Sequence, residues 1–359
     1  MSEWKEYKLG EIITLQRGYD LPRAKMKNGE IPVAGSNGII GYHDQYTTEG
    51  PGITIGRSGN IGVPKFYKGN FWAHNTVLYV KDFHGNDEKF VYYLLQTIDF
   101  TQFNTGSAVP SLNRNHVYEL NISIPLLSEQ KRIASILGSL DDKIDLLHRE
   151  NETLEAMAET LFRKWFIEDA KDESSETILG DVVETISGGT PSRKNEKYYQ
   201  KGTIDWVKSK ELNGTFLLET EEKITEDAVA NSSAKFIPAN SVLIAMYGAT
   251  VGENAIIAKE MTCNQAICAL IPNENYPYTY LFLWAKLMKE EFINLACGAA
   301  QQNISQILIK QQPISDNVNA IKQFHVIVEP FFEKIKLNAK QLYTLTQKKN
   351  LLLMSLMTN

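Results

Sequence analysis

The amino-acid sequence repeats itself, and this repeat limits the possible folds more than any other feature of the chain. LGEIITLQRG at 9–18 returns as LGDVVETISGG at 179–189, and ITIGRSGNIG at 53–62 returns as VLIAMYGATVG at 242–252. In both pairs an apolar stretch leads to glycine. We therefore expect two globular units with the same order of elements.

The second pair contains a glycine-rich loop that could either bind phosphate or turn the chain. Its spacing fits neither G-x-x-x-x-G-K-[ST] nor G-x-G-x-x-G, and a proline follows where a helix would have to begin. Gly59 and Gly62 correspond to Gly248 and Gly252, whereas the side chains between the glycines differ. The pattern therefore predicts a tight turn with positive φ between two strands.

Apolar residues at helical spacing follow each glycine loop. On the repeat, Asn75 corresponds to Asn264, and the segments 87–100 and 278–296 are both predicted to form amphipathic helices. Their aromatic residues could form a base-stacking platform, but helical spacing favours core packing. A polar loop and a strand-like segment come after each helix.

Each copy ends in a helix whose seam positions advance by alternating steps of four and three residues. This strict spacing is typical of the narrow seam of a coiled coil, and the two seams keep a constant offset along the chain. We expect the two helices to pair with one another; the alternative is that each packs only on its own domain. The first seam consists of Leu140, Ile144, Leu147, Asn151, Leu154, Ala158, Leu161 and Trp165, and the second of Phe331, Ile335, Asn338, Leu342, Leu345, Lys349, Leu352 and Leu356.

Three polar residues interrupt these seams. Asn151 lies in the first, and Asn338 and Lys349 lie in the second; such residues fix the register of a coiled coil at some cost in stability. The predicted helix starts are Ser139, as an N-cap, and Pro330, as a first-turn proline.

These patterns predict an α+β protein with two similar α/β domains separated by two long helices. We place the domains at 1–127 and 171–315 and the helices at 128–170 and 316–359. We expect the helices to form an antiparallel coiled coil. Because both copies run in the same chain direction, antiparallel packing would place the domains at opposite ends, related by a pseudo-twofold axis.

Composition excludes several classes of protein. The 359 residues exceed the usual size of one hydrophobic core. The three cysteines and six histidines form no metal-binding or disulfide pattern, so we expect neither a metal nor a cofactor. No apolar run is long enough to span a bilayer, and we expect a cytoplasmic protein without membrane contact.

Five motifs together resemble the specificity (S) subunit of type I restriction-modification systems. The resemblance covers essentially the whole chain and rests on the opening from Trp4 to Gly10, IPVAGSNGIIGYHD at 31–44, SGGTPSRKNEKYYQKGTIDWVKSKEL at 187–212, IPLLSEQKRIASILGSLDDKIDLL at 124–147, and LFRKWF at 161–166.

The resemblance implies two target-recognition domains that each read one half of a bipartite sequence in double-stranded DNA, with the helices as spacer. It also implies that the subunit performs no chemistry and docks methyltransferase subunits, two being expected, with restriction subunits joining the full complex. The second copy has SDNVNAI at 315–321 in place of EQKRI, so the two docking surfaces are not expected to be equivalent.

The sequence agrees with a non-catalytic role. It contains neither the [DNS]-P-P-[YFW] motif of amino-methyltransferases nor a Walker A motif. Two other readings stay open: a stand-alone enzyme whose glycine loops bind a small molecule, and a structural adaptor that tethers partner proteins.

Basic side chains are the candidates for DNA contact, because lysine and arginine bind phosphate and arginine also pairs with guanine. The net charge of −6 requires that these cations be locally concentrated. The segment 193–210 is strongly basic, and acidic residues gather elsewhere, at 167–176 and 219–227. The candidates are Arg17, Lys25, Lys27, Arg57, Lys65 and Arg114 in the first domain and Arg193, Lys194, Lys197, Lys208 and Lys210 in the second, with Tyr198, Tyr199 and Trp206 interleaved and Gln301, Gln302 and Asn303 as weaker candidates.

Overall fold

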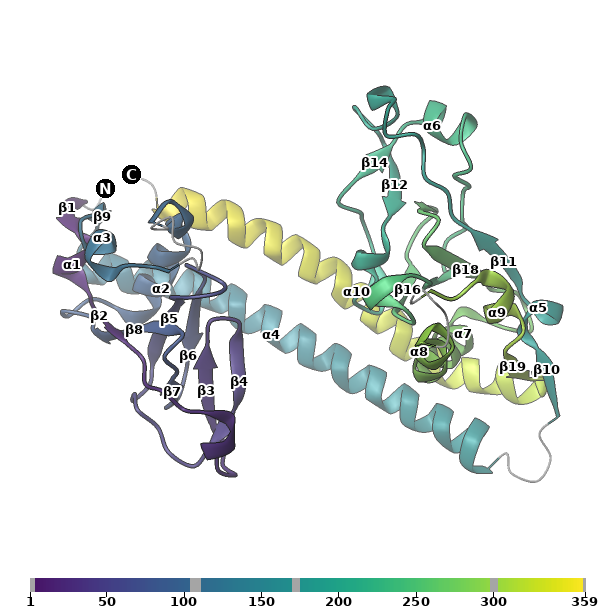
Figure 1. Cartoon of the computed structure of the whole chain (residues 1–359), viewed down its shortest axis with the longest axis horizontal. Helices are drawn as coiled ribbons and strands as arrows, with labels where there is room; N and C mark the ends of the chain where they lie inside the picture. Colours follow the sequence, from purple (N-terminus) through teal and green to yellow (C-terminus); the bar gives the residue numbers. More distant parts are fainter. Residues whose placement is uncertain (1–3, 104–110, 170–174, 298–302, 358–359) are drawn as a thin grey trace. The chain divides into compact units, whose positions relative to one another are not determined.

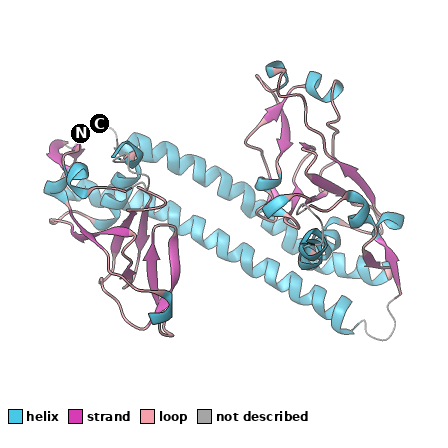
Figure 2. Ribbon diagram, viewed as in Figure 1, coloured by secondary structure: helices cyan, strands magenta, loops and turns pink. Residues whose placement is uncertain are grey.

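The computed structural model describes residues 4–103, 111–169, 175–297 and 303–357. The chain divides into two compact units (Figures 1 and 2): the first comprises Met1–Ile144 and Leu345–Asn359, and the second comprises Asp145–Thr344. Each unit contains one domain of sheets and short helices together with a length of each of two long helices.

The domain of the first unit is built on a four-stranded antiparallel sheet. Its strand order is β2 (Thr14–Arg17), β8 (Val77–Asp82), β5 (Gly52–Gly56) and β6 (Pro64–Tyr67). A second sheet has the order β4 (Gly38–His43), β3 (Ile31–Gly35) and β7 (Trp72–Ala73), and β1 (Lys5–Lys8) pairs with β9 (Asn121–Ile124). The short helices are α1 (Leu9–Ile12), η1 (Arg23–Lys25), α2 (Glu88–Gln96), η2 (Phe100–Phe103) and α3 (Arg114–Tyr118).

The second unit contains the same arrangement of strands. Its main sheet has the order β11 (Glu184–Ser187), β18 (Ile267–Ile271), β15 (Val242–Ala245) and β16 (Asn254–Ile257), extended by β13 (Phe216–Leu217). The smaller sheet is β14 (Lys223–Ile224), β12 (Ile204–Val207) and β17 (Thr262–Cys263), and β10 (Glu176–Ile178) pairs with β19 (Pro313–Ser315). In each domain the smaller sheet contains one parallel pair, β3 with β7 and β12 with β17. The prediction of two similar domains is confirmed.

The helices of the second domain are α5 (Leu179–Val182), η5 (Glu196–Tyr198), η6 (Ser209–Glu211), α6 (Glu226–Ala230), η7 (Gly248–Thr250), α7 (Tyr278–Leu287), α8 (Lys289–Cys297) and α9 (Gln306–Lys310). The prediction of an amphipathic helix at 278–296 is wrong in one respect: α7 is buried from Tyr278 to Ala285, and the chain then breaks into α8. The aromatic residues pack in the core. Tyr280 and Phe162 have ring centroids 5.3 Å apart.

Both glycine loops form the predicted turns. Gly59 and Gly62 have φ of 83° and 80°, and Gly248 and Gly252 have φ of 66° and 81°. The turns close with equivalent backbone hydrogen bonds, from Gly62 to Gly56 (2.9 Å) and from Gly252 to Ala245 (3.0 Å). Residues with a Cβ rarely adopt a positive φ, which explains why glycine recurs in both copies.

The alignment of Asn75 with Asn264 is wrong by one residue. The backbone amide of His74 donates to Ala34 and that of Asn264 donates to Val207, and these acceptors lie on the equivalent strands β3 and β12. His74 is therefore the counterpart of Asn264, and Asn75 is the counterpart of Gln265. The error arises because the loop of the second copy has one more residue between its glycines.

The two long helices are α4 (Leu127–Arg163), which continues into the π-helical turn Lys164–Glu168, and α10 (Val318–Met357). Both predicted starts are wrong, because Ser139 and Pro330 lie inside the helices. Helix α10 begins after Asn317, whose side chain accepts a hydrogen bond from the backbone of Ala320 (3.1 Å). Pro330 is exposed and is flanked by the buried residues Val328 and Phe332, so core packing holds the helix together across the proline.

The two helices pack antiparallel within each unit, which confirms the predicted coiled coil. In the second unit Phe162 contacts Phe324 (ring centroids 5.7 Å apart), and Asn151 contacts Asn338. In the first unit Asp141 and Lys349 form an ion pair of 2.6 Å. Increasing residue numbers along α4 therefore face decreasing residue numbers along α10. All the seam residues predicted from the four-three spacing are buried or half-buried.

Asn338 is the most constrained of the polar seam residues. Its side chain is fully buried, and its Nδ2 donates to Asn151 Oδ1 and Glu150 Oε2, both at 2.8 Å. Its Oδ1 has no hydrogen-bond partner among the described residues. A buried amide of this kind favours one alignment of the helices over others of equal apolar contact.

Replacing Asn338 with leucine should destabilise the chain, since Asn151 then loses its donor inside the seam. We expect a loss of about 1–3 kcal/mol in the free energy of unfolding, measured by urea denaturation. The double variant Asn151→Leu/Asn338→Leu is the control, and it should recover stability because no unpaired amide remains. Equal stability of the single variant and the wild type would contradict the role of this pair.

Gly62 should tolerate an added Cβ poorly. A Cβ there would lie 2.3 Å from Phe100 Cβ, so Gly62→Ala combines a strained φ with a clash and should cost about 1–3 kcal/mol more than Gly85→Ala. Gly85 is a matched control, because its φ is 82° and a Cβ there would meet no atom within 4 Å. Thermal unfolding of the two variants measures the difference.

Candidate nucleic-acid interface

Three arginines of the first domain come together at one end of its main sheet. Arg17 is the last residue of β2, Arg57 follows β5 directly, and Arg114 is the first residue of α3. The backbone of Arg57 accepts a hydrogen bond from Leu112 (2.9 Å), and Arg114 Nη1 donates to the carbonyl oxygen of Leu15 (3.2 Å). These contacts bring β2, the glycine loop and the start of α3 to the same junction.

The arginine cluster, meaning Arg17, Arg57 and Arg114, lacks a carboxylate partner in the part of the chain that the structure describes. Arg57 Nη1 donates only to the carbonyl oxygen of Asn75 (3.4 Å). Burial, and then repulsion from Arg17, lower the pKa of the Arg57 guanidinium. The nearby carboxylate of Asp20 instead accepts from Asn75 (2.7 Å). The cluster is thus an uncompensated positive site.

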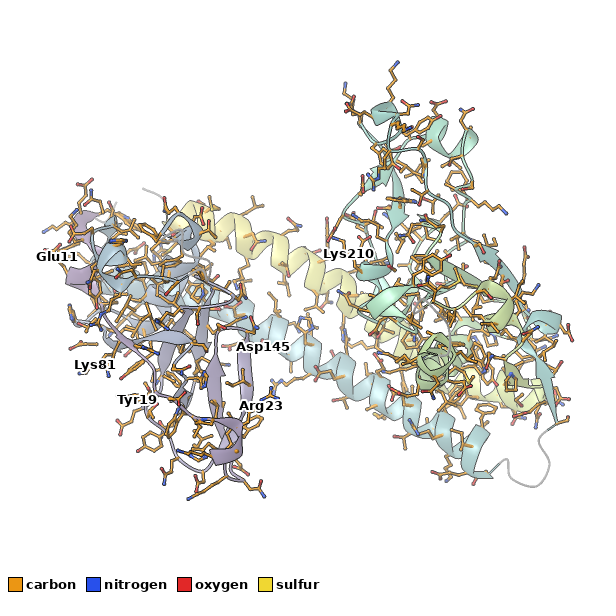
Figure 3. The ribbon with its side chains drawn as sticks, viewed as in Figure 1. Glu11, Tyr19, Arg23, Lys81, Asp145 and Lys210 are labelled. Carbon is orange, nitrogen blue, oxygen red and sulfur yellow. The ribbon has the colours of Figure 1, made fainter. Side chains whose placement is uncertain are left out.

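The remaining basic candidates of the first domain lie apart from this cluster. Lys25 ends η1 and Lys27 follows it, with Lys27 3.9 Å from Asp44. Lys65 is exposed on the edge strand β6, opposite Thr54. Within the described ranges no contact joins these lysines to the arginine cluster. Tyr19, labelled in Figure 3, is 42% exposed and follows Arg17 by two residues, although no motif in the sequence singles it out.

In the second domain, Arg193 is held by neighbours on two sides. Its guanidinium lies 4.1 Å above the ring centroid of Tyr199 and 5.1 Å from that of Trp206. It also binds Glu222 through both terminal nitrogens, the Nη2–Oε2 distance being 2.9 Å. Trp206 is buried, and its indole N–H donates to the carbonyl oxygen of Gly189 (3.0 Å), so this ring belongs to the core and is not a base-stacking surface.

Acidic residues neutralise two of the remaining four lysine candidates. Lys208 lies 3.3 Å from Glu221 and 3.5 Å from Glu222, and Lys210 lies 2.6 Å from Glu221. Hydrogen bonding from Arg193, the largest influence, lowers the pKa of Glu222, which therefore stays ionised at neutral pH.

The expectation that acid and base are segregated in this domain is wrong. The strand β14 pairs antiparallel with β12, setting Lys223 opposite Asp205, and this pairing brings Glu221 and Glu222 onto the basic segment. Lys194 and Lys197 are exposed and have no ion pair in the described part of the chain. Gln301 and Gln302 lie outside the described residues, and Asn303 forms a β-bridge with Tyr247.

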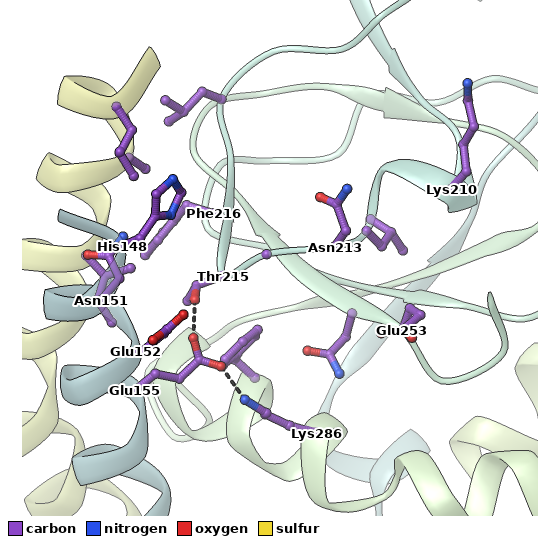
Figure 4. A pocket seen from close by; sticks show the side chains of 18 of the residues that line it. His148, Asn151, Glu152, Glu155, Lys210, Asn213, Thr215, Phe216, Glu253 and Lys286 are labelled. Carbon is purple, nitrogen blue, oxygen red and sulfur yellow. Dashed lines mark hydrogen bonds and ion pairs between the residues drawn. The ribbon is translucent and has the colours of Figure 1, made fainter. Parts of the chain in front are cut away.

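A groove of about 920 Å³ lies within the second unit, between its domain and its lengths of α4 and α10. Figure 4 shows Glu155 of α4 among the residues that line it, and this carboxylate accepts hydrogen bonds from Thr215 and Lys286. Glu152, Glu253 and Lys210 also line it. Thr215 and Lys286 thereby tie the domain to α4, while Glu253 pairs with Lys289 (2.8 Å) and Lys210 with Glu221 (2.6 Å), so the charges of mixed sign in this groove form no concentrated site for an anion.

Two negative findings limit the chemistry of the described residues. They include no group of three or more His, Cys, Asp or Glu side chains arranged to hold a metal ion. In the same part of the chain, no helix has the length and apolar character needed to cross a membrane. Cys263 and Cys268 are buried, and burial raises the pKa of both thiols, to about 12 for Cys268.

Residues 1–156 and 172–347 match the family described as Type I restriction modification DNA specificity domain. The chain belongs to this family. The two matched segments contain the two domains of the repeat, which confirms the resemblance drawn from the motifs.

Individual relatives agree with this family. The Type I restriction enzyme MjaIX specificity subunit of Methanocaldococcus jannaschii is 26% identical over 74% of this chain and 67% of its own length. The HindI specificity subunit of Haemophilus influenzae is 24% identical over 98% of both chains. Among solved structures, the S subunit of a type I restriction-modification system from M. genitalium shares the fold with a TM-score of 0.67 and 17% identity, covering 100% of this chain and 97% of that one.

Removing the charge of Glu222 should uncover the cations of the second domain. We expect Glu222→Gln to raise the affinity for duplex DNA of arbitrary sequence and to steepen the slope of log affinity against log salt concentration by about one, since Arg193 loses its carboxylate partner while Lys208 keeps Glu221. Fluorescence anisotropy across a salt series measures both quantities.

Glu219→Gln is the matched control, because Glu219 lies in the same segment but hydrogen-bonds to Tyr343 (2.9 Å) and to none of the basic candidates. It removes the same charge and should leave the salt dependence unchanged. Equal effects of the two variants would show that only the net charge matters.

Proposed function

We propose that this chain is the DNA-recognition subunit of a type I restriction-modification enzyme, in which each domain reads one half of a bipartite target. The supporting observation is that one strand order occurs twice in the chain, in β2-β8-β5-β6 and β11-β18-β15-β16, with different polar side chains at matching positions. Two copies of one scaffold with different surface chemistry suit two different short sequences.

Under this proposal the helices α4 and α10 act as the spacer between the two recognition domains. The domain limits expected from the sequence, 1–127 and 171–315, assign the strands to recognition and leave the long helices for spacing and docking. The Asn151–Asn338 and Asp141–Lys349 pairs would then fix the spacer by fixing the helix alignment.

The proposal assigns the chemistry to partner subunits. Methyltransferase subunits, two in the full assembly, would dock on the helices and domains, and restriction subunits would join that complex. The exposed side chains at the two helix starts differ: α4 presents Lys131 and Arg132, whereas α10 starts with the Asn317 cap and presents Asn319. We therefore propose unequal contacts with the two methyltransferase subunits.

Co-expression with a methyltransferase subunit from the same genome tests this function. We expect methylation of a bipartite motif that depends on this chain, read by sequencing of modified bases. Lys194→Ala should weaken binding to all sequences alike, because this exposed lysine is proposed to contact phosphate and not bases. The slope of log affinity against log salt concentration should become shallower by about one.

Two other results would reject the proposal in favour of a rival. A structural adaptor would show no salt-dependent DNA binding even with the methyltransferase present. A small-molecule enzyme would show a ligand-induced thermal shift in the absence of DNA.

A further inference from the structure

In each domain one end of the main sheet forms a junction between its first strand, the glycine loop and a later short helix. Three side chains at this junction occupy equivalent positions in the two domains. The backbone amide of Leu112 donates to Arg57 and that of Ile304 donates to Met246, both at 2.9 Å. The adjacent residues form equivalent β-bridges, Ser58 with Ser111 and Tyr247 with Asn303. Arg57 and Met246 are therefore structural counterparts.

The other two pairs follow from the strands and the short helices. Arg17 ends β2 opposite Leu78 of β8, and Ser187 ends β11 opposite Cys268 of β18. Arg114 opens α3 after the N-cap Asn113, and Gln306 opens α9 after the N-cap Ser305. The arginine cluster of the first domain thus corresponds to Ser187, Met246 and Gln306 in the second.

The chemistry at this junction differs completely between the two domains. In the second domain Ser187 donates to Gln306 Oε1, Gln306 Nε2 donates to Thr185 (2.6 Å), and Met246 is buried. The polar side chains of Ser187, Gln306 and Thr185 therefore form hydrogen bonds with one another. In the first domain the three guanidinium groups have no carboxylate partner within the described residues, and burial, followed by repulsion from Arg17, lowers the pKa of Arg57.

The fold itself does not require these charges, because the second domain forms the same junction without them. Arg17 is exposed and Arg57 half-buried, so their mutual repulsion is screened only in part, and a negatively polarised ligand that faces them is attracted to both. Guanine presents two acceptors, O6 and N7, in the major groove, and a guanidinium can donate to both at once.

We propose that Arg17 and Arg57 read guanine in the half-site of the first domain, while Arg114 positions the end of β2 through its bond to Leu15. This inference rests on the proposed function and adds a base identity to it: the first half-site contains guanine whose recognition depends on these two side chains. The second domain reads its half-site without arginine at this junction.

The test uses the complex of the full chain with its methyltransferase, and its readout is the methylated motif. Arg17→Ser and Arg57→Met introduce the residues that the second domain carries, so the fold should tolerate them, and unchanged thermal unfolding checks this. Each variant should reduce the preference for guanine over the other bases in one half-site by about 5- to 150-fold. The base preference in the other half-site should stay the same.

Arg17→Lys and Arg57→Lys separate base reading from phosphate binding. Lysine keeps the charge but lacks the planar fork, so these variants should also lose guanine discrimination. Lys194→Ala is the control in the other domain, and it should reduce methylation of all sites without changing the motif.

Three results would overturn the inference: a wild-type motif without guanine in either half-site, an unchanged motif in Arg17→Ser and Arg57→Met, or full retention of discrimination by the lysine variants. In each of these the wild-type complex still methylates a bipartite motif, so the proposed function survives. Absence of any chain-dependent methylation by the wild type would instead defeat the proposed function and the inference with it.

Discussion

The antiparallel packing of α4 against α10 is the constraint on which the rest of the structure depends. Each unit contains its own length of both helices and its own polar pair, Asp141 with Lys349 in the first and Asn151 with Asn338 in the second. An apolar seam alone would tolerate a shift by one heptad, because similar residues return every seven positions. Such a shift would separate both polar pairs and leave an uncompensated lysine in a largely buried seam, which is strongly unfavourable. The polar residues therefore set the alignment, and the apolar residues supply the stability.

The two domains show how one scaffold supports two surfaces. Backbone groups make the equivalent contacts: the glycine turns close from Gly62 to Gly56 and from Gly252 to Ala245, and the loops before α3 and α9 dock on Arg57 and Met246. Side chains contribute little to these hydrogen bonds, so they can differ without loss of the fold. The junction can consequently hold three arginines in one domain and an internally satisfied polar set in the other. This separation of scaffold and surface suits the proposed reading of two different half-sites.

Local patterns in the sequence were sufficient for the repeat, the glycine turns and the helix pairing. They failed where a distant contact decides the outcome. Ser139 has the side chain of an N-cap, but it lies inside α4 because buried residues before and after it hold the helix against the core. Pro330 likewise lies inside α10, where the buried residues Val328 and Phe332 keep the helix packed. The pairing of β12 with β14, which lays Glu221 and Glu222 on the basic segment, depends on strand partners that local spacing does not specify. The convergence of Arg17, Arg57 and Arg114 has the same cause, although a residue-by-residue alignment of the two copies would have shown three arginines against none.

The distribution of charge explains how an acidic chain can recognise a polyanion. With a net charge of −6 the protein as a whole repels DNA, so attraction must come from local cations. In the second domain Glu221 and Glu222 form ion pairs with Arg193, Lys208 and Lys210, so these cations are less available to a phosphate group. In the first domain the arginine cluster stays uncompensated at a junction where backbone contacts fix its position. Under the proposed role of the arginine cluster, weak general attraction combined with a few fixed donors would favour specificity over affinity, because a wrong base would leave a guanidinium unpaired with little phosphate binding to offset the loss.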